Sequence, residues 1–194
     1  MLTERRTKKF LSVLEHRQPD LTVVMEDIHD PHNVSAMLRS ADAVGVMDVQ
    51  LVYMSEEFPK LGKKSSASAT KWINRRTFKS VEECYKQLHS EGYLICATHL
   101  SKKAKSLYEL DLTQKVALVF GNEHRGVSET AAKLADVNFL IPMVGMIQSL
   151  NVSVACAVSL YEASRQRSSS GKYDTPNFSR EKIDQLFDEW ARKK

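Results

Sequence analysis

One loop of the chain comes close to a phosphate-binding motif. Residues Gly121 to Ser128 read GNEHRGVS, which nearly matches the GxxxxGK[ST] pattern of loops that cradle nucleoside triphosphates. Val127 stands where that pattern needs a lysine, and without the lysine no side chain reaches the outer phosphates. No GxGxxG follows any expected strand either, so triphosphate hydrolysis and ordinary dinucleotide binding are both disfavoured.

An arginine among small residues is a second chemical feature. Arg39 lies in an expected helix, surrounded by side chains that let a phosphate or another backbone come close: Ser35, Ala36, Ser40 and Ala43. This setting suits a catalytic arginine. The residues alone favour the alternative of a surface arginine paired with Asp42 three residues further on, and they leave the catalytic interpretation open.

The elements that position these residues follow a strand and helix alternation. Apolar runs bounded by turn residues predict strands, and apolar residues at helical spacing predict helices. The expected strands are 21–26, 48–54, 72–78, 93–100, 115–120 and 137–143, and the expected helices are 3–17, 34–44, 81–92, one starting at Ser128, and 179–194. Gly45 ends the second helix. The first strand, helix and second strand form a βαβ unit, which predicts a mostly parallel sheet with helices on both faces.

The expected organisation is one α/β domain with a helix at each end. A basic helix covers 1–19, the domain covers 20–167, and a linker with an amphipathic helix covers 168–194. The last helix carries an apolar face formed by Ile183, Leu186, Phe187 and Trp190. Each terminal helix has one such face, so we expect them to pack on each other or on the domain. We expect the segment 55–71 to be an irregular, mobile connection.

Composition narrows the function classes only a little. The 194 residues carry a formal net charge of +4, which makes an anionic partner plausible. The start, MLTERRTKKF, lacks the apolar core of a signal peptide, and no run approaches the ~18 apolar residues of a membrane span. Three well-separated cysteines without a CxxC pattern disfavour a disulfide framework or a structural zinc site. We expect a cytoplasmic protein without metal.

Ligands of open parallel sheets bind at the carboxyl ends of the strands. The loops to consider are 27–33, 98–105, 121–127 and 144–150. The segment from Ile141 to Val158 is almost uncharged, and its polar residues Gln148, Ser149 and Asn151 cluster where the loop becomes a helix. This clustering favours a binding site over a plain core segment.

Three segments together resemble the signature motifs of the SPOUT superfamily of RNA methyltransferases. They are HNVSAMLRSADAVG (32–45), LVFGNEHRGVS (118–128) and IPMVGMIQSLNVSVACAV (141–158), in matching order and spacing. The likeness is greatest to the branch that methylates the ribose 2′-oxygen of guanosine 18 in the tRNA D-loop. It covers roughly residues 1–175. The resemblance implies a deep trefoil knot over about 116–160, a homodimer through the knot region, and S-adenosylmethionine as methyl donor.

The resemblance also implies the site residues. Those expected in catalysis are Asn33, Arg39, Glu123, Ser149 and Asn151, and those expected to bind the cofactor are Thr98, Gly121, Ile141, Met146 and Leu150. Several have a purely structural alternative. Asn33 could cap its helix, Glu123 could be a solvated loop carboxylate, and Ser149 and Asn151 could simply open the last helix of the domain. Ile141 and Leu150 could be core residues.

Two basic clusters are expected to contact RNA phosphates. One holds Arg5, Arg6, Lys8 and Lys9, the other holds Arg165, Arg167 and Lys172, and the resemblance adds His32. The absence of an appended RNA-binding domain favours tRNA over ribosomal RNA as the substrate. A ribosomal RNA methyltransferase and a non-catalytic knotted RNA-binding module are the alternatives.

Overall fold

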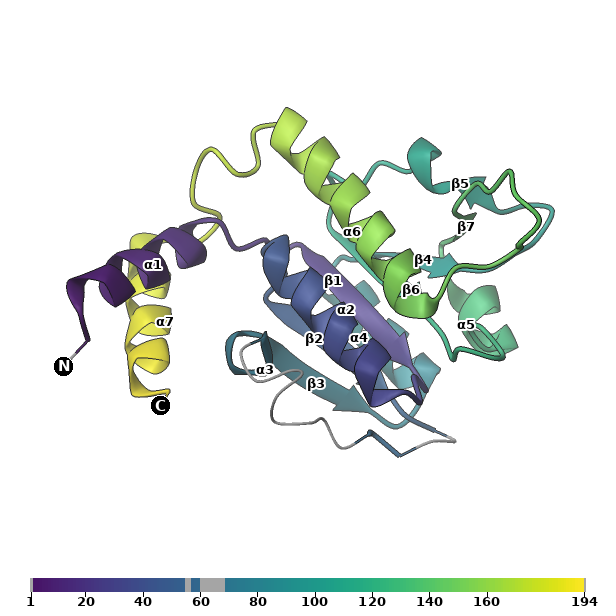
Figure 1. Ribbon diagram of the computed structural model, residues 1–194, viewed down its shortest axis with the longest axis horizontal. Helices are drawn as coiled ribbons and strands as arrows, with labels where there is room; N and C mark the ends of the chain where they lie inside the picture. Colours follow the sequence, from purple (N-terminus) through teal and green to yellow (C-terminus); the bar gives the residue numbers. More distant parts are fainter. Residues whose placement is uncertain (1, 55–56, 60–68, 194) are drawn as a thin grey trace.

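A seven-stranded parallel sheet forms the centre of the computed structural model, which describes residues 2–54, 57–59 and 69–193. The strand order is β3-β2-β1-β6-β4-β7-β5, and every neighbouring pair is parallel (Figure 1). The strands are β1 (Leu21–Glu26), β2 (Asp48–Val52), β3 (Asn74–Phe78), β4 (Leu94–Thr98), β5 (Lys105–Ser106), β6 (Val116–Phe120) and β7 (Val137–Leu140). The expected α/β class with a mostly parallel sheet is confirmed.

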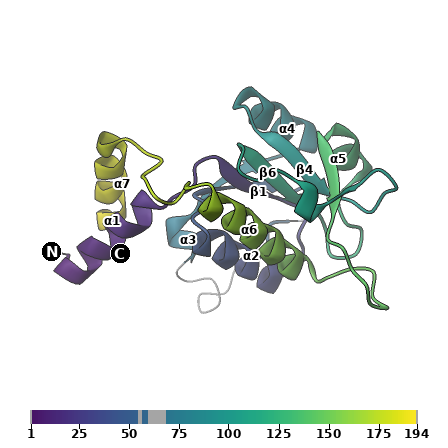
Figure 2. The ribbon, with the colours of Figure 1, turned by 90° about the horizontal axis from the view of Figure 1, so that it is seen from above.

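Helices cover both faces of this sheet. One face carries α2 (Pro31–Ala43) and α6 (Val152–Ser169), and the other carries α4 (Val81–Ser90) and α5 (Glu129–Leu134) (Figure 2). The side chains of β1 show why, because Val23 and Met25 join the apolar cluster under α2 and α6, whereas Val24 joins the cluster under α4 and α5. Successive residues of a strand point to opposite faces, so a strand buried on both sides reads as a continuous apolar run.

The start of α2 differs from the sequence prediction. The helix begins at Pro31, three residues earlier than expected, and Asp30 is its N-cap, accepting a hydrogen bond of 2.8 Å from the backbone N–H of His32. Asn33 therefore does not cap the helix, and the structural alternative for that residue is wrong. Proline is well suited to the first helical position because its missing N–H would have no partner there. The expected end at Gly45 is confirmed: its φ is +87°, in the left-handed region.

The two terminal helices pack on each other. Phe10 and Leu14 of α1 (Glu4–Glu15) meet Ile183, Leu186 and Trp190 of α7 (Arg180–Arg192). The domain contributes two residues to this cluster, Met47 and Trp72. One of the two alternatives predicted for the terminal helices, packing on each other, is therefore confirmed.

Arg17 joins the terminal helices to the domain from within. Its side chain is fully buried, donates to the carbonyl of Val46 and to Asp42, each at 2.7 Å, and lies 5.3 Å from the ring of Trp190. Because Asp42 pairs with Arg17, the predicted alternative of an Arg39–Asp42 pair is wrong. A buried guanidinium needs several such acceptors.

Other departures are local. The expected strand 72–78 begins only at Asn74, because Trp72 ends a one-turn helix, α3 (Ala69–Trp72). The short strand β5 and the 3-10 helix η1 (Leu107–Glu109) were not expected. Most of the connection 55–71, expected to be irregular, lies outside the described residues. No helix within the described ranges is long and apolar enough to cross a membrane.

Arg167 corrects one of the RNA-binding predictions. Its side chain is fully buried and forms an ion pair with Asp20. It also donates to the backbone carbonyls of Leu112 at 2.9 Å and Gln114 at 2.6 Å. Burial would raise the pKa of Asp20, but Lys172 and Arg167 together lower it below the ordinary value of 3.8. Arg167 ties α6 to the amino-terminal ends of β1 and β6, and it is not available to RNA.

Replacing Arg167 by leucine should therefore destabilise the fold. We expect the free energy of unfolding to fall by about 3 kcal/mol or more, because Asp20 and two carbonyls lose their buried donor. Urea denaturation followed by circular dichroism measures this change. Arg165→Leu is the matched control, since Arg165 lies on the same helix and its exposed side chain pairs with Glu162. Equal unfolding midpoints for the two variants would contradict the assignment.

Candidate active site

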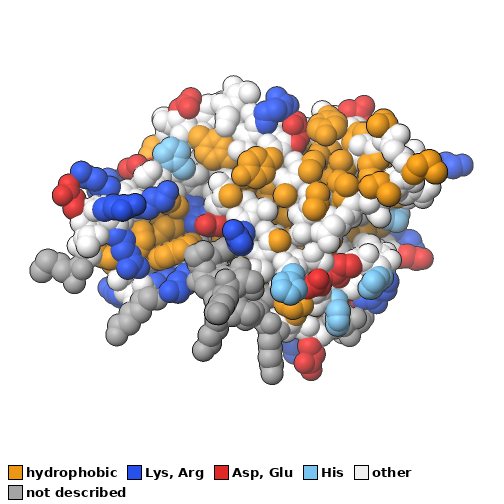
Figure 3. Space-filling view, in the orientation of Figure 1, with side chains coloured by type: hydrophobic (Ala, Val, Ile, Leu, Met, Phe, Trp, Pro, Cys, Tyr) orange, Lys and Arg blue, Asp and Glu red, His pale blue; other side chains and the backbone are white. Residues whose placement is uncertain are grey.

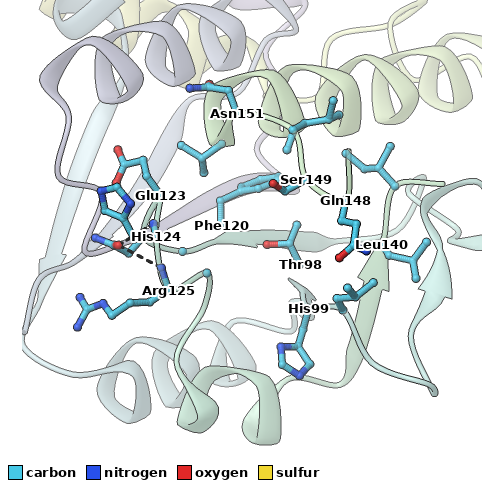
Figure 4. Close-up of a pocket in the computed structure, with 18 of the residues that line it drawn as sticks. Thr98, His99, Phe120, Glu123, His124, Arg125, Leu140, Gln148, Ser149 and Asn151 are labelled. Carbon is cyan, nitrogen blue, oxygen red and sulfur yellow. Dashed lines mark hydrogen bonds between the residues drawn. The ribbon is translucent and has the colours of Figure 1, made fainter. Parts of the chain in front are cut away.

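A cavity of about 500 Å³ opens at the carboxyl ends of β4, β6 and β7. Figure 4 shows Glu123 and Asn151 toward one end, Leu140 and Gln148 toward the other, and Thr98 between them. Its walls come from the strand ends and the loops that follow, at Thr98 to Leu100, Phe120 to Gly126, Phe139 to Met143, and Gln148 to Ala155. Three of the four loops singled out from the sequence line this cavity, as expected for an open parallel sheet.

The fourth loop reaches the cavity through Asn33. The side-chain amide of Asn33 donates to Glu123 Oε1 at 2.9 Å and its oxygen accepts from Asn151 Nδ2 at 3.1 Å. Asn33 itself is only 7% exposed. Three of the five residues expected in catalysis, separated by 90 and 118 positions, are thus joined by two hydrogen bonds. The two hydrogen bonds together fix the orientation of the Asn33 amide and of the side chains of Glu123 and Asn151.

Glu123 is held as a carboxylate. Besides the Asn33 amide it accepts the backbone N–H groups of His29 at 3.1 Å and Asp30 at 3.0 Å, at the start of α2. Burial raises the pKa of Glu123, but these three hydrogen bonds stabilise the charged form and bring the net pKa below 4.5. The alternative of a freely solvated loop carboxylate is therefore wrong.

Asn151 serves two purposes at once. It is the N-cap of α6, because its side-chain oxygen accepts from the backbone N–H groups of Ser153 at 2.9 Å and Val154 at 3.4 Å. Its Nδ2 remains free to donate to Asn33. The cap satisfies helix donors that would otherwise lack a partner. The neighbouring Ser149 is exposed and lines the cavity.

The loop GNEHRGV closes tightly on itself. A Cβ atom on Gly121 would lie 2.2 Å from the backbone of Gly126, so no other residue fits there without a shift. Gly126 has φ of +69° and donates its N–H to the carbonyl of Asn122 at 2.8 Å. These two glycines allow the turn that brings Glu123 back toward Asn33.

The cofactor predictions fall into two groups. The cavity walls include Thr98, Gly121, Ile141 and Leu150. Met146 is not in the wall: its side chain is 99% exposed and projects from the loop that follows Gly145. The expectation for Met146 is that its loop binds the cofactor, mainly through the backbone, and it stays a prediction.

Arg39 lies apart from the cavity. It is exposed on α2 and lines a separate shallow hollow with Ala36, Ser40, Ala43 and Tyr161. Within the described ranges no hydrogen bond or ion pair of its guanidinium is seen. A single chain therefore brings together four of the five expected catalytic residues and leaves the arginine on the outer surface of the helix.

Several wall residues were not expected from the sequence. They are His99, Leu100, Phe120, His124, Arg125, Leu140 and Met143. His99 directly follows β4, Phe120 and Leu140 are the last residues of β6 and β7, and His124 and Arg125 lie in the GNEHRGV loop, so a position at or just after a strand end was the one available signal. Sequence patterning identifies such loops but does not say which side chains turn inward.

The residues expected at RNA differ in exposure. Arg5, Arg6, Lys8, Lys9, His32 and Arg165 are all exposed. Figure 3 shows basic side chains gathered at the end of the molecule formed by the terminal helices. Lys8 also pairs with Glu4 at 2.7 Å across one turn of α1.

The fold and the cavity define an α/β domain with a ligand site formed by the loops of its last strands. The chain belongs to the SpoU rRNA methylase family, whose sequence profile matches residues 20–161. It is 44% identical over 191 residues to the tRNA (guanosine(18)-2′-O)-methyltransferase of Thermus thermophilus, covering 98% of both chains.

Solved structures agree with this assignment. The crystal structure of a TrmH/SpoU tRNA modifying enzyme from Aquifex aeolicus superposes with a TM-score of 0.91 at 38% identity, over 97% of this chain and 95% of that one. The methyltransferase AviRb from Streptomyces viridochromogenes, solved with AdoMet, has a TM-score of 0.70 at 26% identity, over 80% and 62% of the two chains.

The lowered pKa of Glu123 makes a prediction for stability against pH. A carboxyl group whose pKa falls on folding contributes stability that is present above 4.5 and is lost as pH falls through the folded value. Wild type should therefore be more stable than Glu123→Gln at about pH 6, and the difference should shrink toward about pH 3. Urea denaturation at both pH values measures it, with Glu129→Gln as the surface control. A difference that grows on acidification would contradict the network.

Proposed function

We propose that this protein transfers a methyl group from S-adenosylmethionine to the ribose 2′-hydroxyl of a guanosine in tRNA, namely guanosine 18 of the D-loop. The observation that carries the proposal is the joining of Asn33, Glu123 and Asn151 at one end of a cavity that Ser149 also lines. The similarity to the Thermus methyltransferase over nearly the whole chain supports the same substrate. A tRNA substrate places the enzyme in the cytoplasm.

The cavity suits the methyl donor in size and lining. Its volume of about 500 Å³ lies in the range of small-molecule sites, about 300–1,000 Å³. Apolar side chains of Phe120, Ile141 and Leu150 form a slot for an adenine, and the backbone groups after β4 and β6 supply polar partners. When bound, S-adenosylmethionine supplies an electrophilic methyl group on a sulfonium. The ionised Glu123 gives this end of the cavity a negative charge that favours a cationic ligand.

The chain's own residues act mainly by positioning and electrostatics. Asn33 and Asn151 hold each other and Glu123 in one arrangement, which lowers the cost of orienting a ribose beside the cavity. Ser149 offers a hydroxyl at the cavity wall. The reaction needs no metal. Among the described residues, no group of three His, Cys, Asp or Glu side chains is placed to hold a metal ion.

A homodimer completes the proposed site. Large apolar side chains are exposed over α6 and the loop before it, at Val144, Met146, Ile147, Val154 and Tyr161 (Figure 3). Such a contiguous patch marks an interaction surface. A second copy on this face would cover Tyr161, which borders the hollow that contains Arg39. Arg39 would then lie between two subunits, where it can grip the RNA phosphate and stabilise the developing 2′-alkoxide.

The trefoil knot is part of the same proposal. The strand order puts β6 and β7 on either side of β4, and the chain then crosses from β7 to α6, which packs against α2. This order is compatible with a knot over about 116–160. The high structural similarity to the Aquifex enzyme supports the same path.

The exposed basic residues form the proposed RNA-binding surface. Arg5, Arg6, Lys8 and Lys9 on α1, together with Arg165 and His32, are available to phosphates. Arg167 is excluded from this set because it is buried. Binding through phosphates weakens steeply as salt rises.

The decisive experiment is a methyl-transfer assay. The protein is incubated with labelled S-adenosylmethionine and an unmodified tRNA transcript, and nuclease digestion then locates the label. We expect one methyl group on the ribose of guanosine 18 and none on a transcript that already carries a 2′-O-methyl there. A methyl group on a base, or transfer only to ribosomal RNA, would overturn the proposal.

Arg39→Lys tests the proposed role of the arginine. A lysine keeps the charge but cannot form the two parallel hydrogen bonds of a guanidinium, so we expect kcat to fall by about 100-fold or more. Cofactor affinity measured by calorimetry should stay the same. Near-normal turnover by the lysine variant would rule out the two-pronged grip.

Mixing two inactive variants tests whether Arg39 serves the site of the partner subunit. A heterodimer of Arg39→Ala and Asn151→Ala chains holds one intact site if the two residues act across the interface. An equal mixture after subunit exchange should then regain about a quarter of the wild-type activity. No recovery, with exchange verified by mass spectrometry, would place both residues in the same subunit's site.

A further inference from the structure

A second, smaller cavity of about 110 Å³ lies beside the main one. The two share part of their walls, at Asn122, Arg125 and Gly126 of the GNEHRGV loop. The smaller cavity is otherwise bordered by Glu26 and Asp27 at the end of β1 and by Met54 after β2. Neither the motif resemblance nor the proposed chemistry assigns these last three residues a role.

Glu26 holds an unused acceptor in this cavity. Its side chain is 3% exposed, and its Oε2 accepts the backbone N–H of Ser128 at 3.1 Å. Its Oε1 is buried and has no hydrogen-bond partner among the residues that the structure describes. Burial raises the pKa of Glu26, because desolvation disfavours its charged form. A donor entering the cavity would relieve this desolvation cost.

Asp27 adds a second carboxylate beside Glu26, and it pairs with Arg125. Its φ is +48°, an uncommon left-handed conformation for a residue other than glycine. Its N–H donates to Val52 O at 2.9 Å, its carbonyl accepts from Asn122 Nδ2 at 2.8 Å, and its Oδ1 accepts the backbone N–H of Met54 at 2.8 Å. The Arg125 guanidinium lies 3.4 Å from Asp27 Oδ2, and its side chain is 55% exposed. The neighbouring residues thus hold the backbone of Asp27 in an uncommon conformation, at the point where Asp27 pairs with Arg125 beside the cavity.

We propose that this cavity reads the base of the methylated nucleotide and selects guanine. The Watson–Crick edge of guanine offers an acceptor, O6, next to two donors, N1–H and N2–H₂. The cavity offers the complementary groups. The exposed Arg125 guanidinium can donate to O6, and Glu26 Oε1 can accept from N1–H or N2–H₂. Adenine presents a donor where guanine has O6 and an acceptor where guanine has N1–H, so it meets like groups on both sides. Met54, 44% exposed, gives the ring an apolar contact.

The position of the cavity fits this role. It adjoins the end of the main cavity where Glu123 and Asn33 lie, since Asn122 and Arg125 border both cavities and directly flank the Glu123–His124 pair in sequence. A nucleotide whose ribose lies beside Glu123 can therefore extend its base toward Glu26. The inference rests on the proposed methyl transfer and adds the group that distinguishes guanosine from other nucleosides. Sites that hydrogen-bond a substrate reject analogues lacking the matching group more strongly than apolar pockets do.

The first test uses the wild-type protein with altered transcripts. The target guanosine is replaced by inosine, which lacks only the N2 amine, or by adenosine, which reverses the edge. We expect kcat/KM to fall by about tenfold for inosine and by more for adenosine. Equal kcat/KM for guanosine and adenosine transcripts would overturn the inference, because the cavity would then not distinguish the two bases.

The second test asks whether Glu26 and Arg125 carry the preference. Glu26→Gln replaces one acceptor by an N–H donor, and Arg125→Gln, at an exposed side chain, removes the guanidinium without risk to the core. Each should reduce the guanosine-to-adenosine ratio of kcat/KM by about tenfold. Glu129→Gln changes a nearby exposed carboxylate that pairs with Lys133, and it should leave the ratio unchanged.

Cofactor affinity, measured by calorimetry, separates this inference from the proposed function. Normal affinity and turnover with an unchanged base preference in both variants would overturn the base-reading role alone. No methyl transfer to any transcript by the wild-type protein would overturn both. Should Glu26→Gln fail to fold, the Arg125→Gln ratio decides the matter.

Discussion

The side-chain amide of Asn33 is the contact on which the site depends. Its two hydrogen bonds join a residue of α2 to the loop after β6 and to the first turn of α6, three segments that are far apart along the chain. An amide has one donor end and one acceptor end, so only one orientation satisfies both Glu123 and Asn151. The cap at Asp30 sets the start of α2 and with it the direction in which Asn33 points. The backbone N–H of His29 then holds the other oxygen, Oε2, and the backbone N–H of Asp30 shares Oε1 with Asn33.

Two glycines in the loop after β6 allow Glu123 to reach Asn33. The backbone around Gly121 and Gly126 approaches so closely that a single added methyl group would collide. A rigid, close-packed turn places Glu123 without relying on long side chains, whose ordering would cost conformational entropy. The site is therefore held by backbone geometry and short polar groups, an arrangement suited to chemistry that depends on alignment more than on proton transfer.

Much of the fold could be predicted from periodicity, and much of the site from loop position. The βαβ pattern predicted the parallel sheet, and the rule for strand ends indicated the loops that line the cavity. The role of Asn33 was harder, although Asp30 followed by Pro31 is itself a helix-start signal that would have moved the cap three residues earlier. The burial of Arg167 could not be predicted, because Arg165 and Arg167 look alike in sequence and only Asp20, 147 positions away, distinguishes them. Strand β5 is two residues long and exists only through its pairing with β7.

The buried ties between the two ends of the chain have a consequence for synthesis on the ribosome. Asp20 and the carbonyls of Leu112 and Gln114 lack their hydrogen bonds from Arg167 until that residue has been made. The apolar face of α1 is covered only once α7 has been made. At about 5–20 residues per second, Phe10 and Leu14 spend many seconds without their final partners. The nascent chain thus keeps the apolar face of α1 exposed until α7 has left the exit tunnel.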